Sequence, residues 1–166
     1  MPDPTAAGGE IQIVVLQVGH ELYGAPIRDV REVVPAESYR ITPIPRIPRY
    51  IRGVTNLRGR VIPVMDLRMR LGFTPGPVTR KTRIAVVETE ASGTVGMIVD
   101  GVSEVVRLPV RTIEPPPEDR TDGSLAFVQG VARLGDRLVA LLDLHRVLTR
   151  EDRRPAIEGG RHGAAV

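Results

Sequence analysis

Short apolar runs separated by turn-forming residues follow one another along most of this chain. Residues 11–18 are rich in β-branched side chains and partly alternate between apolar and polar, which predicts a half-buried strand. The pattern elsewhere is also mostly short and extended, as is typical of an all-β protein. Further strands are predicted at 22–27, 60–65, 83–88, 94–99, 102–106, 125–131 and 137–142.

Three segments break this pattern. Residues 35–50 contain four prolines, and residues 115–123 open with three, so both are predicted to be surface loops. The stretch 27–34 fits either a strand or a helical turn. Asp66 and Asp143 each follow a predicted strand, where a carboxylate is well suited to cap a short helix.

The chain also contains an internal repeat. Residues 53–67 recur at 130–144, with Gly, Val, Leu, Arg, Asp and Leu in register. A second pair of segments, 23–34 and 95–106, shares Gly, Val, Glu and a pair of valines. Two copies are too few for a solenoid, which needs at least three to bury a continuous core, so the repeat indicates two similar small modules.

Each copy is predicted to hold about five short strands and a turn of helix. A bundle of this size usually closes into a barrel, because closure removes exposed strand edges. We therefore expect one domain over 10–150, with a first barrel at about 11–72 and a second at about 80–150. Exchange of strands between the two barrels stays open. Residues 1–9 and 151–166 lack periodicity and are predicted to be flexible tails.

The composition restricts which residues can form the core and which kinds of chemistry the protein can perform. Only 3% of residues are aromatic against 42% hydrophobic, so the core must be built from Val, Ile and Leu. The absence of Cys excludes disulfides, thiolate metal sites and a cysteine nucleophile. No apolar run approaches the roughly 20 residues that span a bilayer, and residues 1–9 do not resemble a secretion signal. A soluble cytoplasmic protein is expected.

The charge of +3 and the pI of about 9.9 permit a basic β-barrel that binds nucleic acid, which is the alternative function. The arginines, however, are scattered singly and acids follow them closely. Nucleic-acid barrels stack bases on aromatic side chains, and an SH3-type reader of polyproline also needs several. The five aromatics here do not cluster in the sequence: Tyr23, Tyr39, Tyr50, Phe73 and Phe127.

Signals for an enzyme are weak. The three histidines, His20, His145 and His162, fall in a turn, a closing helix and a tail. No serine lies in a nucleophile-elbow pattern, no Gly-rich phosphate loop is present, and no spacing of His and acids suggests a metal site. We expect no catalytic residue, no cofactor and no metal.

One block of sequence is highly specific: residues 50–67 read Y-I-R-G-V-T-N-L-R-G-R-V-I-P-V-M-D-L. Supporting stretches are the Tyr-Gly pair at 23–24, V-R-E-V at 30–33 and G-M-I-V-D-G-V-S-E-V at 96–105. On these motifs the chain closely resembles the CheW family, adaptors of bacterial chemotaxis signalling complexes. The resemblance extends over about residues 11–148.

The resemblance implies an all-β fold of two tandem five-stranded SH3-like β-barrels packed together, with a short helix after each barrel. It implies a non-enzymatic scaffold that couples the cytoplasmic tips of methyl-accepting chemoreceptors to the regulatory domain of the histidine kinase CheA. Further CheW copies in receptor arrays are an additional implied partner. Nucleic-acid binding and direct membrane insertion are not implied. The implied location is the cytoplasm, at membrane-bound chemoreceptor arrays.

Arg58 is the leading candidate for a functional contact. It lies in a predicted turn beside Gly59, where its guanidinium can offer a planar fork to a partner. From the residues alone, an internal ion pair with Glu32 or Asp66 is an equally good interpretation. The resemblance favours receptor contact, because the matching arginine in the family is associated with it. The second copy has Gly135 in this register, and a purely structural arginine should have been needed twice.

Other receptor-binding candidates come from the resemblance. Val30 and Glu32 match the family segment beside the receptor groove, although the repeated acids Glu32 and Glu104 also fit a structural role. Val30, Ile84 and Val105 are candidates for the floor of an apolar groove between the barrels, and each also fits an ordinary core position. Kinase binding is expected on the surface of the first barrel, without a choice of strands.

A last group of residues is predicted to be structural. Glycines suit special backbone angles or close packing, an asparagine suits bracing its own turn, and aspartates suit helix caps. The residues assigned these roles are Gly53, Asn56, Gly59, Asp66, Gly130 and Asp143.

Overall fold

The computed structural model describes residues 9–116 and 123–148, and within them strands predominate. The first sheet, sheet A, has the order β8-β1-β2-β10-β9, and the second, sheet B, has the order β3-β6-β7-β5-β4. Sheet A contains β1 (Glu10–Val18), β2 (Glu21–Pro26), β8 (Gly101–Pro109), β9 (Val128–Leu134) and β10 (Arg137–Leu142). Sheet B contains β3 (Val30–Pro35), β4 (Ile51–Leu57), β5 (Arg60–Asp66), β6 (Arg83–Thr89) and β7 (Gly93–Val99).

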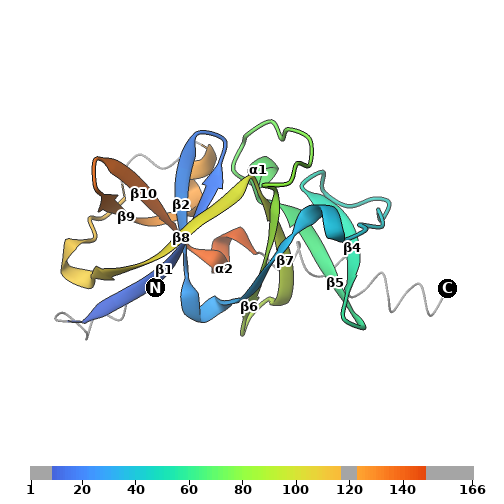
Figure 1. Ribbon diagram of the computed structural model, residues 1–166, viewed down its shortest axis with the longest axis horizontal. Helices are drawn as coiled ribbons and strands as arrows, with labels where there is room; N and C mark the ends of the chain where they lie inside the picture. The colour runs from blue at the N-terminus through green and yellow to red at the C-terminus, as the bar shows by residue number, and fades with distance from the viewer. Residues whose placement is uncertain (1–8, 117–122, 149–166) are drawn as a thin grey trace.

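The two sheets form two SH3-like barrels, which confirms the predicted all-β fold. Figure 1 shows the barrels side by side along the long axis of the molecule, with helix α2 (Leu144–Val147) between them. Helix α1 (Leu67–Arg70) follows β5 as α2 follows β10. The tails predicted at 1–9 and 151–166 lie outside the described residues, apart from Gly9.

Each barrel combines strands from both copies of the repeat. Sheet A takes β1 and β2 from the first copy and β8, β9 and β10 from the second. The copies meet along four pairs of strands: β2 with β10 and β5 with β7 are parallel, whereas β1 with β8 and β3 with β6 are antiparallel. The pairs within one copy are all antiparallel. This arrangement is the exchange of strands that the sequence left open. A barrel made from 11–72 alone would lack β6 and β7, the centre of sheet B.

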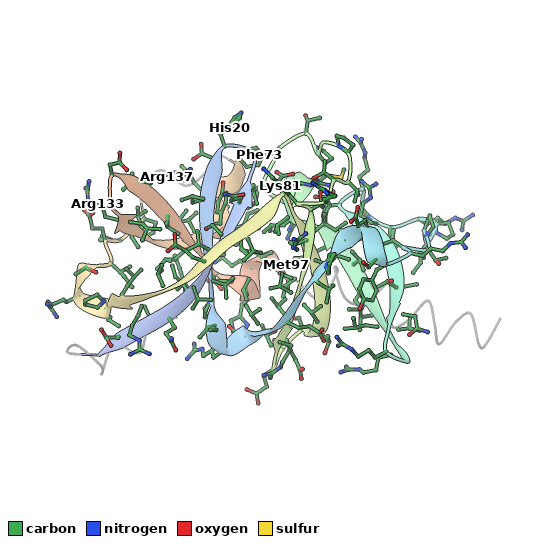
Figure 2. All side chains as sticks on the ribbon, viewed as in Figure 1. His20, Phe73, Lys81, Met97, Arg133 and Arg137 are labelled. Atoms are coloured by element: carbon green, nitrogen blue, oxygen red, sulfur yellow. The ribbon has the colours of Figure 1, made fainter. Side chains whose placement is uncertain are left out.

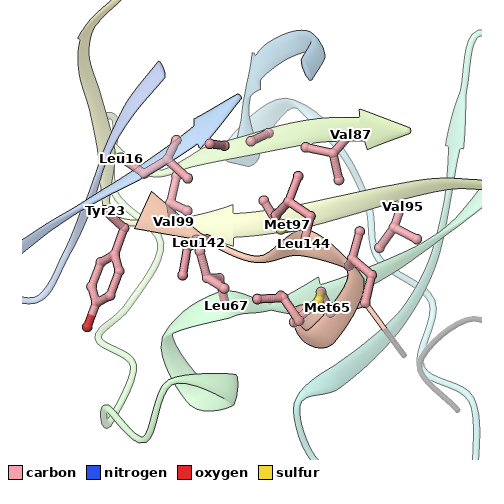
Figure 3. Close-up of a cluster of buried hydrophobic side chains, with 14 of the residues drawn as sticks. Leu16, Tyr23, Met65, Leu67, Val87, Val95, Met97, Val99, Leu142 and Leu144 are labelled. Carbon is pink, nitrogen blue, oxygen red and sulfur yellow. The ribbon is translucent and has the colours of Figure 1, made fainter. Parts of the chain in front are cut away.

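Three apolar cores result from this arrangement. One fills the barrel of sheet A, a second fills the barrel of sheet B, and the central core lies between the two barrels. Figure 3 shows the central core, where Leu67 of α1 and Leu144 of α2 meet side chains of both sheets. Hydrophobic burial therefore joins the barrels as well as closing each one.

The middle of β1 shows why its sequence is apolar at every position from Ile13 to Leu16. Ile13 and Val15 point into the barrel of sheet A, while Val14 and Leu16 point into the central core. Successive side chains of a strand face opposite sides, so a strand between two cores needs apolar residues on both. The prediction of a half-buried strand was therefore wrong here, since these four residues are at most 4% exposed.

Two other boundaries differ from the sequence pattern. The ambiguous stretch 27–34 contains both alternatives, a 3₁₀ turn at Ile27–Asp29 followed by β3. The strand predicted at 125–131 starts only at Val128, because residues Gly123–Phe127 form a 3₁₀ helix. Phe127 turns its ring to Arg70, and its carbonyl accepts a hydrogen bond from Asp143 N instead of continuing the ladder.

Candidate interaction surface

Arg58 occupies the two-residue turn between β4 and β5. Arg58 and Gly59 have φ angles of 53° and 88°, so both adopt the left-handed conformation that suits tight hairpin turns. Asn56 Oδ1 accepts a hydrogen bond from Gly59 N at 2.7 Å and so braces the turn from within. The turn holds the Arg58 side chain at the surface, where it is 65% exposed.

Arg58 and Glu32 form an ion pair. Arg58 Nη1 donates to Glu32 Oε2 at 2.5 Å, joining the turn to β3. The hydrogen bond from Arg58 lowers the pKa of Glu32 below its ordinary value, and the positive charge of Arg58 acts in the same direction. The same hydrogen bond raises the pKa of Arg58. Of the two internal partners considered from the sequence, Glu32 is therefore the one that Arg58 contacts.

This ion pair leaves most of the guanidinium available. Within the described part of the chain, Nη1 is the only Arg58 atom that donates a hydrogen bond. The guanidinium has five N–H donors in a fixed plane, so the outer edge can still bind a carboxylate or backbone carbonyls. The second copy has no counterpart, because Gly135, with φ of 64°, occupies the equivalent position.

The two candidate valines differ in exposure. Val105 lies on β8 opposite Val14, and half of its surface is exposed. Val30, at the start of β3, is half-buried and packs against the central core. Both can therefore present some apolar surface to a partner.

Ile84 has no such surface. Its side chain is 1% exposed in the core of sheet B, where its Cγ2 atom lies 2.9 Å from the position that a Cβ on Gly96 would occupy. The prediction that Ile84 lines a receptor groove was wrong. It failed because alternate residues of β6 face the barrel interior and the central core, a choice that the apolar sequence does not reveal.

A second ion pair, between Arg31 and Glu88, lies next to the Arg58–Glu32 pair and was not predicted from the sequence. Arg31 Nε lies 3.1 Å from Glu88 Oε1 across the β3–β6 pairing, and both side chains are substantially exposed. A bulge between Val30 and Glu32 interrupts that pairing. The alternation of basic and acidic residues at 31–32 was the available signal. Without knowledge of the partner strand, it could not name Glu88.

The two glycines predicted to allow close packing do so at equivalent places. A Cβ on Gly53, whose φ is 140°, would lie 2.0 Å from Thr42 O. A Cβ on Gly130 would lie 2.8 Å from Ile113 Cγ2 and 3.4 Å from Glu114 O. In both copies the loop crosses the glycine and pairs with the next residue, as the Thr42–Val54 and Glu114–Val131 bridges show. 

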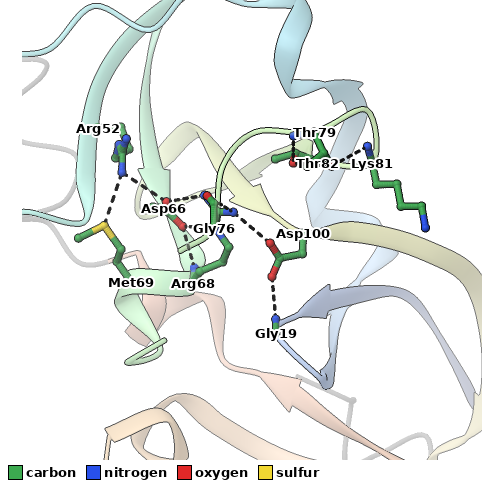
Figure 4. Close-up of polar contacts among 10 residues, drawn as sticks. All are labelled: Gly19, Arg52, Asp66, Arg68, Met69, Gly76, Thr79, Lys81, Thr82 and Asp100. Atoms are coloured by element: carbon green, nitrogen blue, oxygen red, sulfur yellow. Dashed lines mark hydrogen bonds and ion pairs between the residues drawn. The ribbon is translucent and has the colours of Figure 1, made fainter. Parts of the chain in front are cut away.

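Asp66 does more than cap α1. Its Oδ1 accepts a hydrogen bond from Arg68 N, and its two oxygens also accept bonds of 2.9 Å from Arg68 Nε and Nη2. Arg68 Nη1 donates to Asp100, which in turn accepts a bond from Gly19 N at 2.7 Å. Figure 4 shows this buried network, with Arg52 at its edge. It ties sheet B to the β1–β2 turn of sheet A.

Asp143 has a simpler environment. Its Oδ1 accepts a hydrogen bond from His145 N at the start of α2, which is a helix cap of the predicted kind. Arg146 Nε lies 3.7 Å from Asp143 Oδ2, and the Arg146 side chain is 56% exposed. The second copy therefore keeps the cap but not the buried arginine.

The charged and aromatic side chains bear on nucleic-acid binding. Figure 2 shows Arg133 and Arg137 at one end of the molecule, with Lys81 well away from them. Tyr23 packs edge-on against Phe73, with 6.4 Å between the ring centroids. Neither observation provides the basic, aromatic-lined groove that such barrels use, so this alternative is not favoured.

Two negative observations apply to residues 9–116 and 123–148. No group of three or more His, Asp or Glu side chains there is placed to hold a metal ion. No helix in this part of the chain is long and apolar enough to cross a membrane.

Comparisons with known proteins give a consistent result. A model of the family described as "CheW-like domain" matches residues 12–152. The chain is 34% identical over 151 residues to chemotaxis protein CheW of Rhizobium meliloti, covering 89% of this chain and 94% of that protein. It is 32% identical over 142 residues to chemotaxis protein CheW of Klebsiella aerogenes, covering 85% and 83%.

A solved structure agrees with these matches. The crystal structure of the scaffolding protein TtCheW from Thermoanaerobacter tengcongensis superposes with a TM-score of 0.75 at 40% sequence identity. The match covers 84% of this chain and 92% of that one. The chain therefore belongs to the CheW-like domain family.

Proposed function

We propose that this protein is a scaffold that couples chemoreceptor tips to the histidine kinase CheA and catalyses no reaction itself. The observation that carries the proposal is the family match over residues 12–152, which includes both barrels and both short helices. Solved and sequenced relatives named for chemotaxis and scaffolding support it. The protein would act in the cytoplasm at membrane-bound receptor arrays, alongside further copies of itself.

The proposed receptor contact centres on Arg58. Its side chain is exposed, its backbone is held by the tight turn, and Glu32 fixes one edge of its guanidinium. A side chain that is already positioned loses less conformational entropy when a partner binds. Val30 and Val105 supply apolar surface for the same partner, a helical hairpin, while Ile84 supports the fold from inside.

The proposed kinase contact lies on the outer surface of the barrel that carries β4 and β5. Val61, at the start of β5, is 67% exposed. A large apolar side chain left in water is typical of a position that a partner covers. Val61 pairs with Asn56 on the hairpin whose turn carries Arg58, so the two contacts lie close together. A change at Arg58 leaves Val61 in place and therefore tests the receptor contact by itself.

The experiment is binding of purified protein to a receptor tip fragment and to the CheA regulatory domain. Arg58→Glu should weaken receptor binding at least about tenfold, since it reverses the charge at the contact centre. Binding to CheA should largely remain. Arg137→Glu makes the same charge change on an exposed arginine of the second copy, and it should leave both interactions intact.

Two results would contradict the proposal. Equal loss of both partners in a folded Arg58→Glu variant would mean that Arg58 maintains the structure rather than a contact. Failure of the unmodified protein to bind either partner, together with salt-sensitive retention on single-stranded RNA, would restore the nucleic-acid alternative.

A further inference from the structure

Arg70 lies at the junction of the two copies. Its Cζ atom is 4.5 Å from the centre of the Tyr50 ring and 4.7 Å from the centre of the Phe127 ring. Tyr50 and Phe127 are equivalent in the repeat: the carbonyl of each accepts a hydrogen bond from the aspartate that caps the following helix, Asp66 and Asp143. One guanidinium therefore contacts the same position of both copies, at nearly equal distances.

The same side chain also binds the end of α2. Arg70 Nε donates to Val147 O at 3.2 Å, and Nη2 donates to Arg146 O at 3.3 Å. Carbonyls in the last turn of a helix have no partner within the helix, so a cation there satisfies them. Because Arg70 is the last residue of α1, a single side chain connects the two short helices.

Only the first copy carries this arginine. The equivalent residue is Val147, which is fully buried in the central core. Because its Cζ atom lies within 4.7 Å of the equivalent ring centre in each copy, Arg70 lies near the axis that relates the copies. A second guanidinium at the equivalent position would lie close to the first and repel it. The repeat is asymmetric at this point.

We propose that Arg70, which is present in the first copy only, sets the relative orientation of the two barrels by contacting both copies. The central core draws the barrels together, but hydrophobic attraction has no preferred direction. The guanidinium is planar, and its two carbonyl acceptors and two ring faces have fixed directions. The contacts of Arg70 thus add directional interactions that the apolar core lacks, next to the Arg68–Asp100 network that joins sheet B to the β1–β2 turn. This inference does not depend on the proposed function.

The first test is stability. Arg70→Met keeps the length of the side chain and removes the guanidinium, and it should lower Tm by about 5 °C. Arg70→Lys keeps the charge against the rings but loses the planar fork, so its effect should be smaller. Arg111→Met is the control, because Arg111 is an exposed arginine in the 3₁₀ turn Val110–Thr112. That variant should match the unmodified protein.

The second test measures orientation directly. The chain has no cysteine, so Glu90→Cys and Asp136→Cys would place one spin label in an exposed turn of each barrel. Pulsed electron spin resonance should give one narrow distance distribution, which broadens or shifts with Arg70→Met and stays unchanged with Arg111→Met. An unchanged distribution in a folded Arg70→Met protein would overturn the proposal.

A change at Phe127, one of the two rings that Arg70 contacts, provides an independent check if Arg70→Met fails to fold. Phe127→Leu keeps an apolar side chain and removes one of the two ring faces, and it should also broaden the distance distribution. The double variant Arg70→Lys/Phe127→Leu should lower Tm by less than the sum of the decreases in the two single variants, because both changes act on one contact. Strict additivity together with unchanged distances would show that the ring and the arginine act separately.

Discussion

The turn between β4 and β5 and the turn between β9 and β10 hold equivalent places in the repeat, yet only the first carries a cation. Arg58 and Gly135 have nearly the same φ angle, 53° and 64°. Glycine adopts this conformation freely, whereas for other residues the conformation costs about 1 kcal/mol or more of free energy. The second turn thus has the residue that folding prefers. The first keeps an arginine against that preference, which points to a role beyond the fold.

The helix caps show a second difference between the copies. Asp66 and Asp143 both cap a four-residue helix, but only Asp66 holds a buried arginine. Arg68 is 4% exposed, whereas His145 in the equivalent place is exposed. Its hydrogen bond to Asp66 is the main reason that the pKa of Arg68 is raised. The first copy therefore uses its cap to join the two sheets, and the second uses it only to start a helix.

The largest expected effect is a difference in unfolding free energy between alanine variants of these two caps. Asp66→Ala would leave Arg68 buried without its main partner, which should cost about 3–5 kcal/mol of unfolding free energy. Asp143→Ala removes only a cap hydrogen bond and should cost about 1 kcal/mol. Urea denaturation of the two variants measures the difference. Equal losses would show that the Arg68 network adds nothing to the cap.

The second largest difference in stability is expected between alanine variants of the two closely packed glycines, Gly53 and Gly130. Gly53→Ala would place a Cβ against the Thr42 carbonyl at a φ of 140°, and should cost about 2–4 kcal/mol. Gly130→Ala meets first the Ile113 side chain, which can rotate away, so about 1 kcal/mol is expected. Thermal unfolding of both variants provides the check. A larger loss for Gly130→Ala would contradict the ranking.

Making the first turn resemble the second gives a smaller effect on stability. Arg58→Gly removes the unfavourable backbone conformation and the ion pair together, and these changes oppose each other. We expect Tm to stay within experimental error, while binding of the receptor tip fragment falls. A clear drop in Tm would assign Arg58 to the fold.

The smallest effect concerns pH. Arg58 lowers the pKa of Glu32, so the folded state binds this proton less readily than the unfolded state. The stability from this pair is therefore fully present above the ordinary Glu pKa of 4.5 and is lost as pH falls through the lowered value. The Tm difference between the unmodified protein and Glu32→Gln should be small at pH 7 and vanish in acid. A difference that grows on acidification would reverse this sign.

Much of the local structure could be predicted from the sequence. The strands, the tight turn at Arg58, the bracing by Asn56 and the helix caps all arise from residues close together in the chain, so short motifs carry them. The repeat also pointed to two modules. The family resemblance rested on the same short motifs, and the match over residues 12–152 shows that it was sound.

The pairing of distant residues was decided only by the tertiary structure. Glu32 and Arg58 are 26 residues apart. Arg70 and Phe127 belong to different copies of the repeat and are 57 residues apart. The burial of Ile84 likewise depends on which face of β6 points into its barrel.

The sequence by itself determined the short strands, the turns, the caps and the doubling of the fold, because local backbone preferences act over a few residues. The tertiary structure decided that β1 and β2 join β8, β9 and β10, and that one arginine lies between two equivalent rings. Such choices depend on how much apolar surface each pairing buries and on which directional contacts it completes. Both quantities are properties of the packed molecule rather than of any short segment.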